Sequence, residues 1–248
     1  MRILRLGLLI QLIILLGVIP FTCFASANNQ SKQDTLSQPS GPRIVLLQTV
    51  QESIHPTLPD FIFKLYGYTE KDSHTVRKLE IIRADKPNEV FQKIIFPRTE
   101  IGEYPSTIDS GGFTIEDMNF DGYKDFRLQQ WITTGANTPY RYWIWNQATS
   151  QFILNNELEP ITSPRMDYEN KEIVSYVRDG AARHIIITYK YIDGHILQTQ
   201  MIQTEVDLPN NLIHITVERL KNGSTVTAKY DAPYPGPSYS EIEQSLNL

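Results

Sequence analysis

The sequence predicts an all-β protein whose antiparallel strands follow one another as a meander. Short segments rich in β-branched and aromatic residues recur from residue 43 onward, with turn residues between them. No segment keeps a helical period of 3.6 residues. A strong hairpin signal, Lys221-Asn222-Gly223, separates two such segments near the carboxyl end. Because a single sheet of this many strands would curl, we expect a barrel, a sandwich or a small propeller-like body.

The first 27 residues have the pattern of a Sec-type signal peptide. A short basic start precedes the apolar run 6–20, and an A-x-A site ends at Ala27. An uncleaved membrane anchor is less well supported, because the run is short and ends in a cleavage site. A lipoprotein attached at Cys23 is also less well supported, because Pro20-Phe21-Thr22 matches the small-residue lipobox poorly. We therefore expect a periplasmic or secreted protein with no membrane segment after cleavage.

Composition limits what the remaining chain can be. Cys23 is the single cysteine, so the exported chain would contain neither a thiol nor a disulfide. Its stability must come from a core, from a bound ion, or from both. Loss of Arg2 and Arg5 with the signal takes the formal charge from −5 to −7. A mildly acidic chain argues against nucleic-acid binding, which needs a cationic surface.

The chain divides into a linker, one β domain and a tail. Residues 28–42 are polar and predict a flexible tether. Residues 43–232 predict a single β domain, and the Pro-rich residues 233–248 either add a helical turn or stay loose. The expected strands are 43–50, 60–68, 76–84, 90–96, 113–115, 126–132, 141–145, 151–154, 172–177, 184–191, 195–206, 212–220 and 224–230.

The stretch 117–125, DMNFDGYKD, carries the chemistry that is easiest to interpret. Oxygen-bearing side chains occupy its first, third, fifth and ninth positions, and glycine occupies its sixth. Calcium takes several oxygen ligands, and a glycine allows the sharp bend that brings them together. The candidate ligands are the side chains of Asp117, Asn119, Asp121 and Asp125 and the backbone carbonyl of Tyr123.

The alternative for this stretch is a metal-free type I′ hairpin turn on Asp121-Gly122. The full spacing is much rarer by chance than Asp-Gly alone, so it favours a calcium ion with a structural role. The loop is not an EF-hand, because Leu128 stands where a bidentate glutamate is required. It resembles the calcium loops of FG-GAP and similar β-repeat modules, here in one copy.

The sequence shows no enzyme motif. It contains no G-x-S-x-G elbow, no H-E-x-x-H and no phosphate-binding glycine loop, and its five histidines are dispersed. A hydrolase using paired acids could be built on Glu100 with Glu103, or on Glu116, but solvated surface acids are the simpler interpretation of each. We therefore expect a protein that acts by binding.

The order of features from the loop onward carries a family resemblance. The loop is followed by Tyr142-Trp143-Ile144-Trp145, and later by Ser175-Tyr176-Val177-Arg178-Asp179-Gly180. Over roughly residues 110–200 this order resembles exported Gram-negative proteins with a single calcium loop in a β-propeller-like body. One member of that family is the immunity partner of a secreted lysozyme-like effector. The resemblance implies an inhibitor of a peptidoglycan hydrolase.

Such an inhibitor can plug an acidic catalytic cleft with a rigid loop that donates hydrogen bonds. The candidate partner-binding residues lie on or beside one predicted hairpin turn: Ser175, Arg178, Gly180 and Arg183. Asp179 departs from the glycine-rich turn of the relatives and is ill suited to a carboxylate-lined cleft. The alternative is an envelope or surface module that binds glycan or protein, for which one face of the aromatic run 142–145 is a candidate unless both faces are core.

Overall fold

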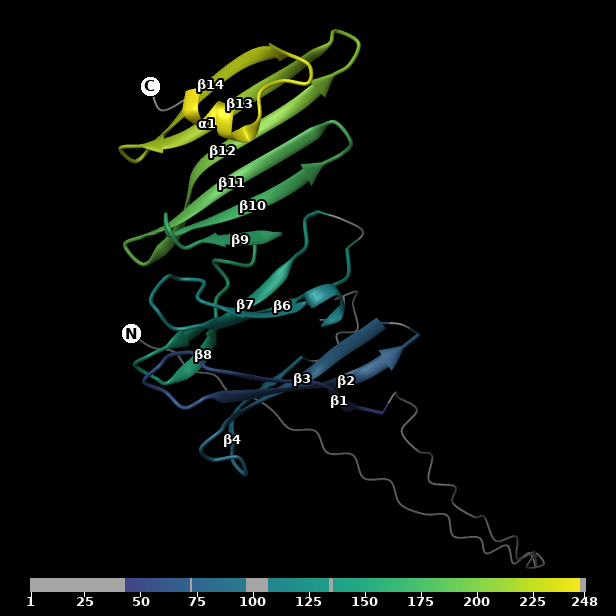
Figure 1. Ribbon diagram of the computed structural model, residues 1–248, viewed down its shortest axis with the longest axis vertical. Helices are drawn as coiled ribbons and strands as arrows, with labels where there is room; N and C mark the ends of the chain where they lie inside the picture. Colours follow the sequence, from purple (N-terminus) through teal and green to yellow (C-terminus); the bar gives the residue numbers. More distant parts are fainter. Residues whose placement is uncertain (1–42, 72, 97–106, 134–135, 246–248) are drawn as a thin grey trace, which may run out of the picture. The chain divides into compact units, whose positions relative to one another are not determined.

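A computed structural model of the protein describes residues 43–71, 73–96, 107–133 and 136–245. The expected signal peptide and linker lie outside the described residues. Almost all of the described secondary structure is antiparallel β-strand, arranged in three meander sheets (Figure 1). The first sheet contains β1 (Val45–Glu52), β2 (Phe61–Glu70), β3 (Ser73–Arg83) and β4 (Val90–Ile95).

The other two sheets follow in chain order. The second contains β5 (Phe113–Glu116), β6 (Asp125–Gln129), β7 (Tyr140–Asn146) and β8 (Gln151–Leu154). The third contains β9 (Pro164–Asp167), β10 (Glu172–Asp179), β11 (Arg183–Ile192), β12 (His195–Asp207), β13 (Leu212–Lys221) and β14 (Ser224–Pro233). A 3-10 turn, η1 (Asp109–Gly111), precedes β5, and a helix, α1 (Tyr239–Ser245), follows β14.

The expected fold class is confirmed, and each predicted segment forms a strand. Within the part of the chain that the structure describes, one strand was missed. β9 begins at Pro164 and lies at the edge of the third sheet. Proline has no backbone N–H to donate to a β-ladder and is therefore tolerated mainly at the starts of strands and in edge strands. A proline in a short segment argues against a strand, which is why the sequence did not predict β9.

The first two sheets pack face to face as a sandwich. Alternate residues of β2 are buried, and Phe61 and Phe63 contact Trp145, Phe126 and Phe152 of the second sheet. Thr107 also bridges the two sheets, through Thr75 of β3 and Gln129 of β6. A sandwich was one of the bodies expected from the sequence.

Gly67 marks an irregularity that shapes the first sheet. The register of β2 against β3 shifts between Tyr66 and Gly67. A Cβ on Gly67 would lie 1.8 Å from the carbonyl oxygen of Thr75. Only glycine therefore allows the two backbones to approach this closely.

The third sheet has a smaller core of its own. One of its faces carries Ile202, Ile213, Ile215 and Val217, which are buried together with Ile242 of α1. Figure 1 shows α1 lying against the strands at the β12–β14 side of this sheet. This helix is the one regular element that the structure describes in the Pro-rich tail.

A separate cluster connects the second and third sheets. Met118 of the 117–125 stretch and Tyr142 of β7 are buried with Met166 and Ile173 of the third sheet. The Tyr142 hydroxyl donates a hydrogen bond to the carbonyl of Ile161, at 2.6 Å. The apolar even positions of the candidate calcium loop thus anchor it to the third sheet. Among the described residues, no helix combines the length and the hydrophobicity needed to cross a membrane.

Candidate functional site

The candidate calcium loop connects β5 to β6. Glu116 pairs with Asp125 across the two strands, so the connection comprises residues 117–124. Positive φ angles fall on Phe120 (61°) and Gly122 (92°). A type I′ turn would need them on Asp121 and Gly122 and would join the strands by two residues. The connection is therefore not the type I′ hairpin that was the alternative for this stretch.

Backbone amides of the loop fold around the side chain of Asp117. Its carboxylate oxygens accept the amides of Asp121 at 3.2 Å and Gly122 at 2.9 Å. The carboxylate of Asp121 accepts the amide of Tyr123 at 2.9 Å and the side-chain amide of Asn119 at 3.1 Å. These hydrogen bonds curl the chain into a compact polar turn.

Asp125 differs from the other acids because it is completely buried. Its two oxygens accept the backbone amides of Met118 and Trp145, both at 2.8 Å. Burial raises the pKa of Asp125 to about 8; the two amides oppose this shift, and the charges of Asp121 and Asp117 add to it. A buried carboxylate beside two others is an environment that a cation would stabilise.

Tyr191 of β11 also belongs to this environment, and the sequence did not indicate it. Its hydroxyl oxygen is buried and has no hydrogen-bond partner within the described part of the chain. Burial raises the pKa of Tyr191, and the charges of Asp125, Glu157 and Asp117 raise it further. No local motif marks this tyrosine, because it reaches the loop from a strand far along the chain.

The loop offers the oxygen ligands that calcium prefers. Its carboxylates, however, are arranged as in a hydrogen-bonded turn. Every candidate ligand offers oxygen, which is what calcium takes. Across the described residues, no group of three or more His, Cys, Asp or Glu side chains is disposed to hold a metal ion. The side chains of Asp117, Asn119, Asp121 and Asp125 and the carbonyl of Tyr123 are the groups that would hold the ion.

A cavity of about 560 Å³ opens beside the loop. Its walls include His55, Glu116, Asp117, Lys124 and Tyr168. Glu116, nominated as a hydrolase acid, forms an ion pair with Arg127 at 2.7 Å. The hydroxyl of Tyr168 also donates to Glu116, at 3.4 Å. The other nominated acids, Glu100 and Glu103, lie outside the described residues.

The second candidate site is the turn between β10 and β11, and the structure brings only part of it together. Gly180 is exposed and has a φ of 82°, which allows the chain to reverse there. Ser175 does not lie at the turn: it is buried, and its hydroxyl donates to the carbonyl of Thr162 at 2.5 Å. Arg178 and Arg183 lie on either side of the turn.

Arg183 is occupied by acids of its own chain. Its guanidinium contacts Asp179 at 2.7 Å and Glu205 of β12 at 3.1 Å. These contacts raise the pKa of Arg183. The first contact also pairs Asp179, the acid that is ill suited to a carboxylate-lined cleft, with a cation.

Arg178 has a fixed backbone and is exposed to solvent. The side chain of Asn137 accepts the Arg178 amide at 2.7 Å and donates to the Arg178 carbonyl at 2.8 Å. Asn137 thereby continues the β-ladder where β9 no longer pairs with β10. Its φ of 68° is one that asparagine adopts more readily than most residues. We name residues 178–183, with this clamp, the hairpin tip.

The aromatic run of β7 is core on both faces. Trp143 and Trp145 are buried in the sandwich, and Tyr142 is buried in the cluster next to the third sheet. Alternation along the strand explains why both faces are apolar, since each packs against a different layer. Within the described residues, this run offers no aromatic binding face.

Comparison with known proteins yields a structural likeness but no family. No protein-family model matches the chain, and a search of curated proteins finds no match. A solved structure described as "Structure of a Xanthomonas Type IV Secretion System related protein" is similar, with 13% sequence identity and a TM-score of 0.43. The likeness covers 75% of this chain and 87% of that one. At these values it does not define a family for the chain.

Proposed function

We propose that this is an exported protein that acts by binding a macromolecule rather than by catalysis, and that the hairpin tip is its contact surface. The observation that carries the proposal is the environment of Arg178. Its backbone is clamped by Asn137, and among the described residues its exposed guanidinium has no side-chain partner. A rigid backbone reduces the entropy lost when a loop is ordered on binding.

The chemistry of the tip suits an acidic cleft. Arginine donates paired hydrogen bonds to carboxylates, and glycosidases carry two carboxyl groups beside the bond they cleave. Because Arg183 pairs with Asp179 and Glu205, Arg178 is the cation of the tip for which the described residues show no ion pair. A lysozyme-like peptidoglycan hydrolase is therefore the partner we propose, with self-protection as the role.

This proposal is tested by inhibition of peptidoglycan lysis. Purified protein is titrated against a panel of lysozymes, including any encoded next to its gene, and loss of turbidity is followed. Arg178→Ala should weaken inhibition by at least about tenfold, because removal of one partner of a buried charge pair costs about 2–5 kcal/mol or more. Lys221→Ala, which removes an exposed cation at another hairpin, is the matched control.

Asn137→Ala distinguishes the contribution of the Arg178 side-chain contact from that of the rigid backbone that Asn137 holds. It keeps the guanidinium but removes the clamp, so inhibition should weaken while the protein stays folded. Undiminished lysis by every enzyme of the panel in the presence of the unaltered protein would contradict the inhibitor proposal.

We also propose that the 117–125 loop binds one calcium ion with a structural role. Thermal unfolding in calcium at about a hundredfold excess over the dissociation constant should give a melting temperature about 5–10 °C higher than in chelator. Asp121→Ala should abolish this difference. Asp193→Asn, which removes an equal charge from another Asp-Gly turn, should preserve it. Equal melting temperatures with and without calcium would refute the site.

A second candidate function is binding of a glycan or protein of the cell envelope at the cavity beside the loop. The observation that favours it is Tyr168, which is 54% exposed at the wall of that cavity. Aromatic rings are enriched at binding surfaces. Retention of the protein on purified peptidoglycan, lost in Tyr168→Ala and without effect on hydrolases, would favour this function over inhibition.

A further inference from the structure

The last strand of the third sheet, β14, has a long outer edge. In the described part of the chain, β14 pairs only with β13, although it runs from Ser224 to Pro233. Residues 224–229 of this strand are all exposed. An open edge of this length presents a row of unpaired backbone donors and acceptors that favours pairing with another strand.

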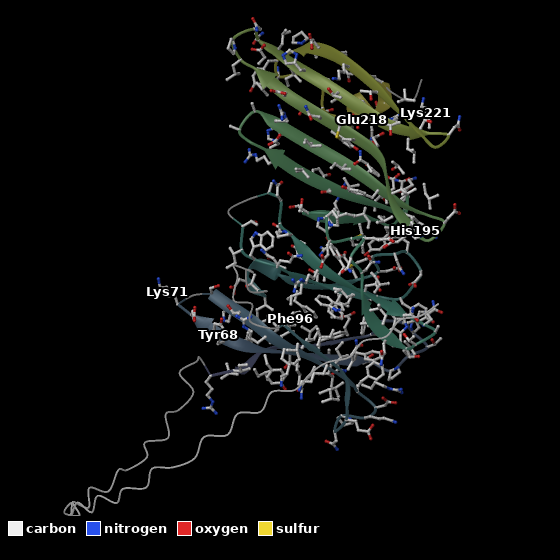
Figure 2. The ribbon with its side chains drawn as sticks, turned by 180° about the vertical axis from the view of Figure 1, so that it is seen from behind. Tyr68, Lys71, Phe96, His195, Glu218 and Lys221 are labelled. Atoms are coloured by element: carbon white, nitrogen blue, oxygen red, sulfur yellow. The ribbon has the colours of Figure 1, made fainter. Side chains whose placement is uncertain are left out.

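The hairpin turn shows which backbone groups face outward. Asn222 and Gly223 have φ angles of 51° and 77°, and Lys221 pairs with Ser224, which together describe a two-residue type I′ connection. In such a turn, the two residues that flank the loop, here Lys221 and Ser224, form a hydrogen-bonded pair. Along the two strands, the following pairs alternate between non-hydrogen-bonded and hydrogen-bonded. Consequently the residues that direct their N–H and C=O groups away from β13 are Thr225, Thr227, Lys229 and Asp231. Figure 2 labels Lys221 at the end of this hairpin.

Pro233 ends the open segment. It falls on the same outward-facing alternation, but it has no N–H to donate. Its carbonyl already accepts the amide of Gly236 at 2.7 Å. The outward donors of β14 are therefore those of residues 225–231.

Side-chain amides cover the backbone at two other places along strand edges. Gln92 of β4 donates to the carbonyl of Phe152 at 2.8 Å and accepts its amide at 3.0 Å, which covers the edge of β8. Asn137 covers the edge of β10 at Arg178 in the same way. Within the described ranges, no side-chain amide covers β14 in this manner. The helix α1 does not cover this edge either, because it packs on the sheet face over Ile202 and Ile213.

We propose that β14 is a dimerisation edge, at which a second copy of this chain adds its own β14 in antiparallel orientation. The pairing is centred on Tyr230, so that Lys229 of each copy lies opposite Asp231 of the other. Both residues are outward-facing, so their backbones exchange hydrogen bonds in this register. Thr227 lies opposite Pro233 and gains no backbone hydrogen bond, so the interface is short. The two charged pairs are related by the two-fold axis of the dimer, as a closed interface requires.

The side chains of β14 are self-complementary in this register. Lys229 and Asp231 lie on the same face of the sheet, two residues apart, so each meets an opposite charge across the interface. Asp231 can accept from lysine and keep its contact with His214 at 2.8 Å, because a carboxylate has about four acceptor positions. The two Tyr230 rings lie opposite each other on the other face, and aromatic cross-strand pairs are favourable.

The proposal is tested by charge reversal and mixing. Sedimentation of the purified protein at up to about 0.1 mM, roughly a hundred times a micromolar dissociation constant, should show a dimer. Lys229→Asp places an acid opposite each Asp231, and Asp231→Lys places a lysine opposite each Lys229. Each variant alone should dimerise at least about tenfold more weakly, because two attractive pairs become repulsive. Lys221→Asp, outside the paired segment, should leave dimerisation unchanged.

Mixing the two variants distinguishes an interface from a folding defect. In the mixed dimer, the acid introduced at position 229 of one variant faces the base introduced at position 231 of the other. The unaltered Asp231 and Lys229 also face each other, so both pairs are again attractive. Affinity should therefore return to within about threefold of the original protein, which no damage to a single chain could produce.

Three results would count against the proposal. A monomer throughout the concentration range, or a dimer insensitive to both substitutions, would overturn the dimerisation edge. Failure of the mixed variants to associate would overturn the register centred on Tyr230.

Discussion

The sandwich of β1–β8 and the sheet of β9–β14 bury their side chains in different ways. In the sandwich, both sheets contribute large aromatic residues to one shared core, in which Phe126 stacks on Trp143 with ring centroids 4.9 Å apart. The third sheet buries aliphatic residues under one short helix, and its last strand stays exposed along most of its length. The same meander topology thus serves a packed core in one region and an accessible surface in the other.

This difference indicates where stability and binding reside. Two sheets that face each other bury their apolar faces against one another and need no other molecule to do so. A sheet with one covered face and an open edge keeps polar and backbone groups available to partners. The hairpin tip and the β14 edge, which we propose for hydrolase binding and for dimerisation, both belong to the third sheet.

The largest effect is expected from Phe126→Ala in the sandwich. The Phe126 side chain is fully buried and contacts Phe63, Trp143 and Phe152. Its removal should lower the free energy of unfolding by about 3–5 kcal/mol, measured by urea denaturation. Val226→Ala on β14, where the side chain is 52% exposed, should change it by less than about 0.5 kcal/mol. Similar losses at the two sites would show that the two regions are not different in packing.

A smaller effect is expected from Ile242→Ala in α1. This residue is 2% exposed and covers the buried face of the third sheet. We expect a loss of about 2–3 kcal/mol, because the cavity would lie near the surface and can partly collapse. Hydrogen exchange should accelerate in β12 and β13 more than in β2 and β6. Uniform acceleration would show that the third sheet does not open separately.

The smallest effect is expected from Asp109→Asn, which tests a polar contact beside the sandwich. Burial alone would raise the pKa of Asp109, but hydrogen bonds from the His74 amide (2.8 Å), the His74 ring (2.6 Å) and the Thr107 hydroxyl (2.9 Å) outweigh it and hold the pKa below its usual value. Asp109→Asn should cost about 1–2 kcal/mol at neutral pH, measured by urea denaturation.

The same residue predicts a pH dependence. Because the folded-state pKa of Asp109 is lowered, its contribution to stability is complete above its unfolded-state pKa of about 3.9 and is lost as pH falls through the folded-state value. The difference in unfolding free energy between the original protein and Asp109→Asn should therefore shrink as pH falls below about 4. A difference that stays constant down to about pH 2 would rule out this linkage.

Sequence reasoning located the strands and turns well because these features are local. Alternation of apolar residues predicts a half-buried strand, and Asn222-Gly223 predicts a hairpin, without reference to the rest of the chain. It located β9 poorly, because a short strand starting at Pro164 carries almost no pattern. It grouped Ser175 with Arg178 by nearness in sequence, whereas burial separates them.

What the sequence alone determined is the all-β class, a single cysteine that excludes a disulfide within one chain, and the oxygen-rich composition of the 117–125 stretch. Only the tertiary structure decided that Asp125 is buried, that Tyr191 lies near the loop, and that Asn137 clamps Arg178. The physical reason is that composition and alternation are properties of neighbouring residues. A buried charge, a clamp or an open edge depends on which distant segments pack together, and that depends on the whole chain.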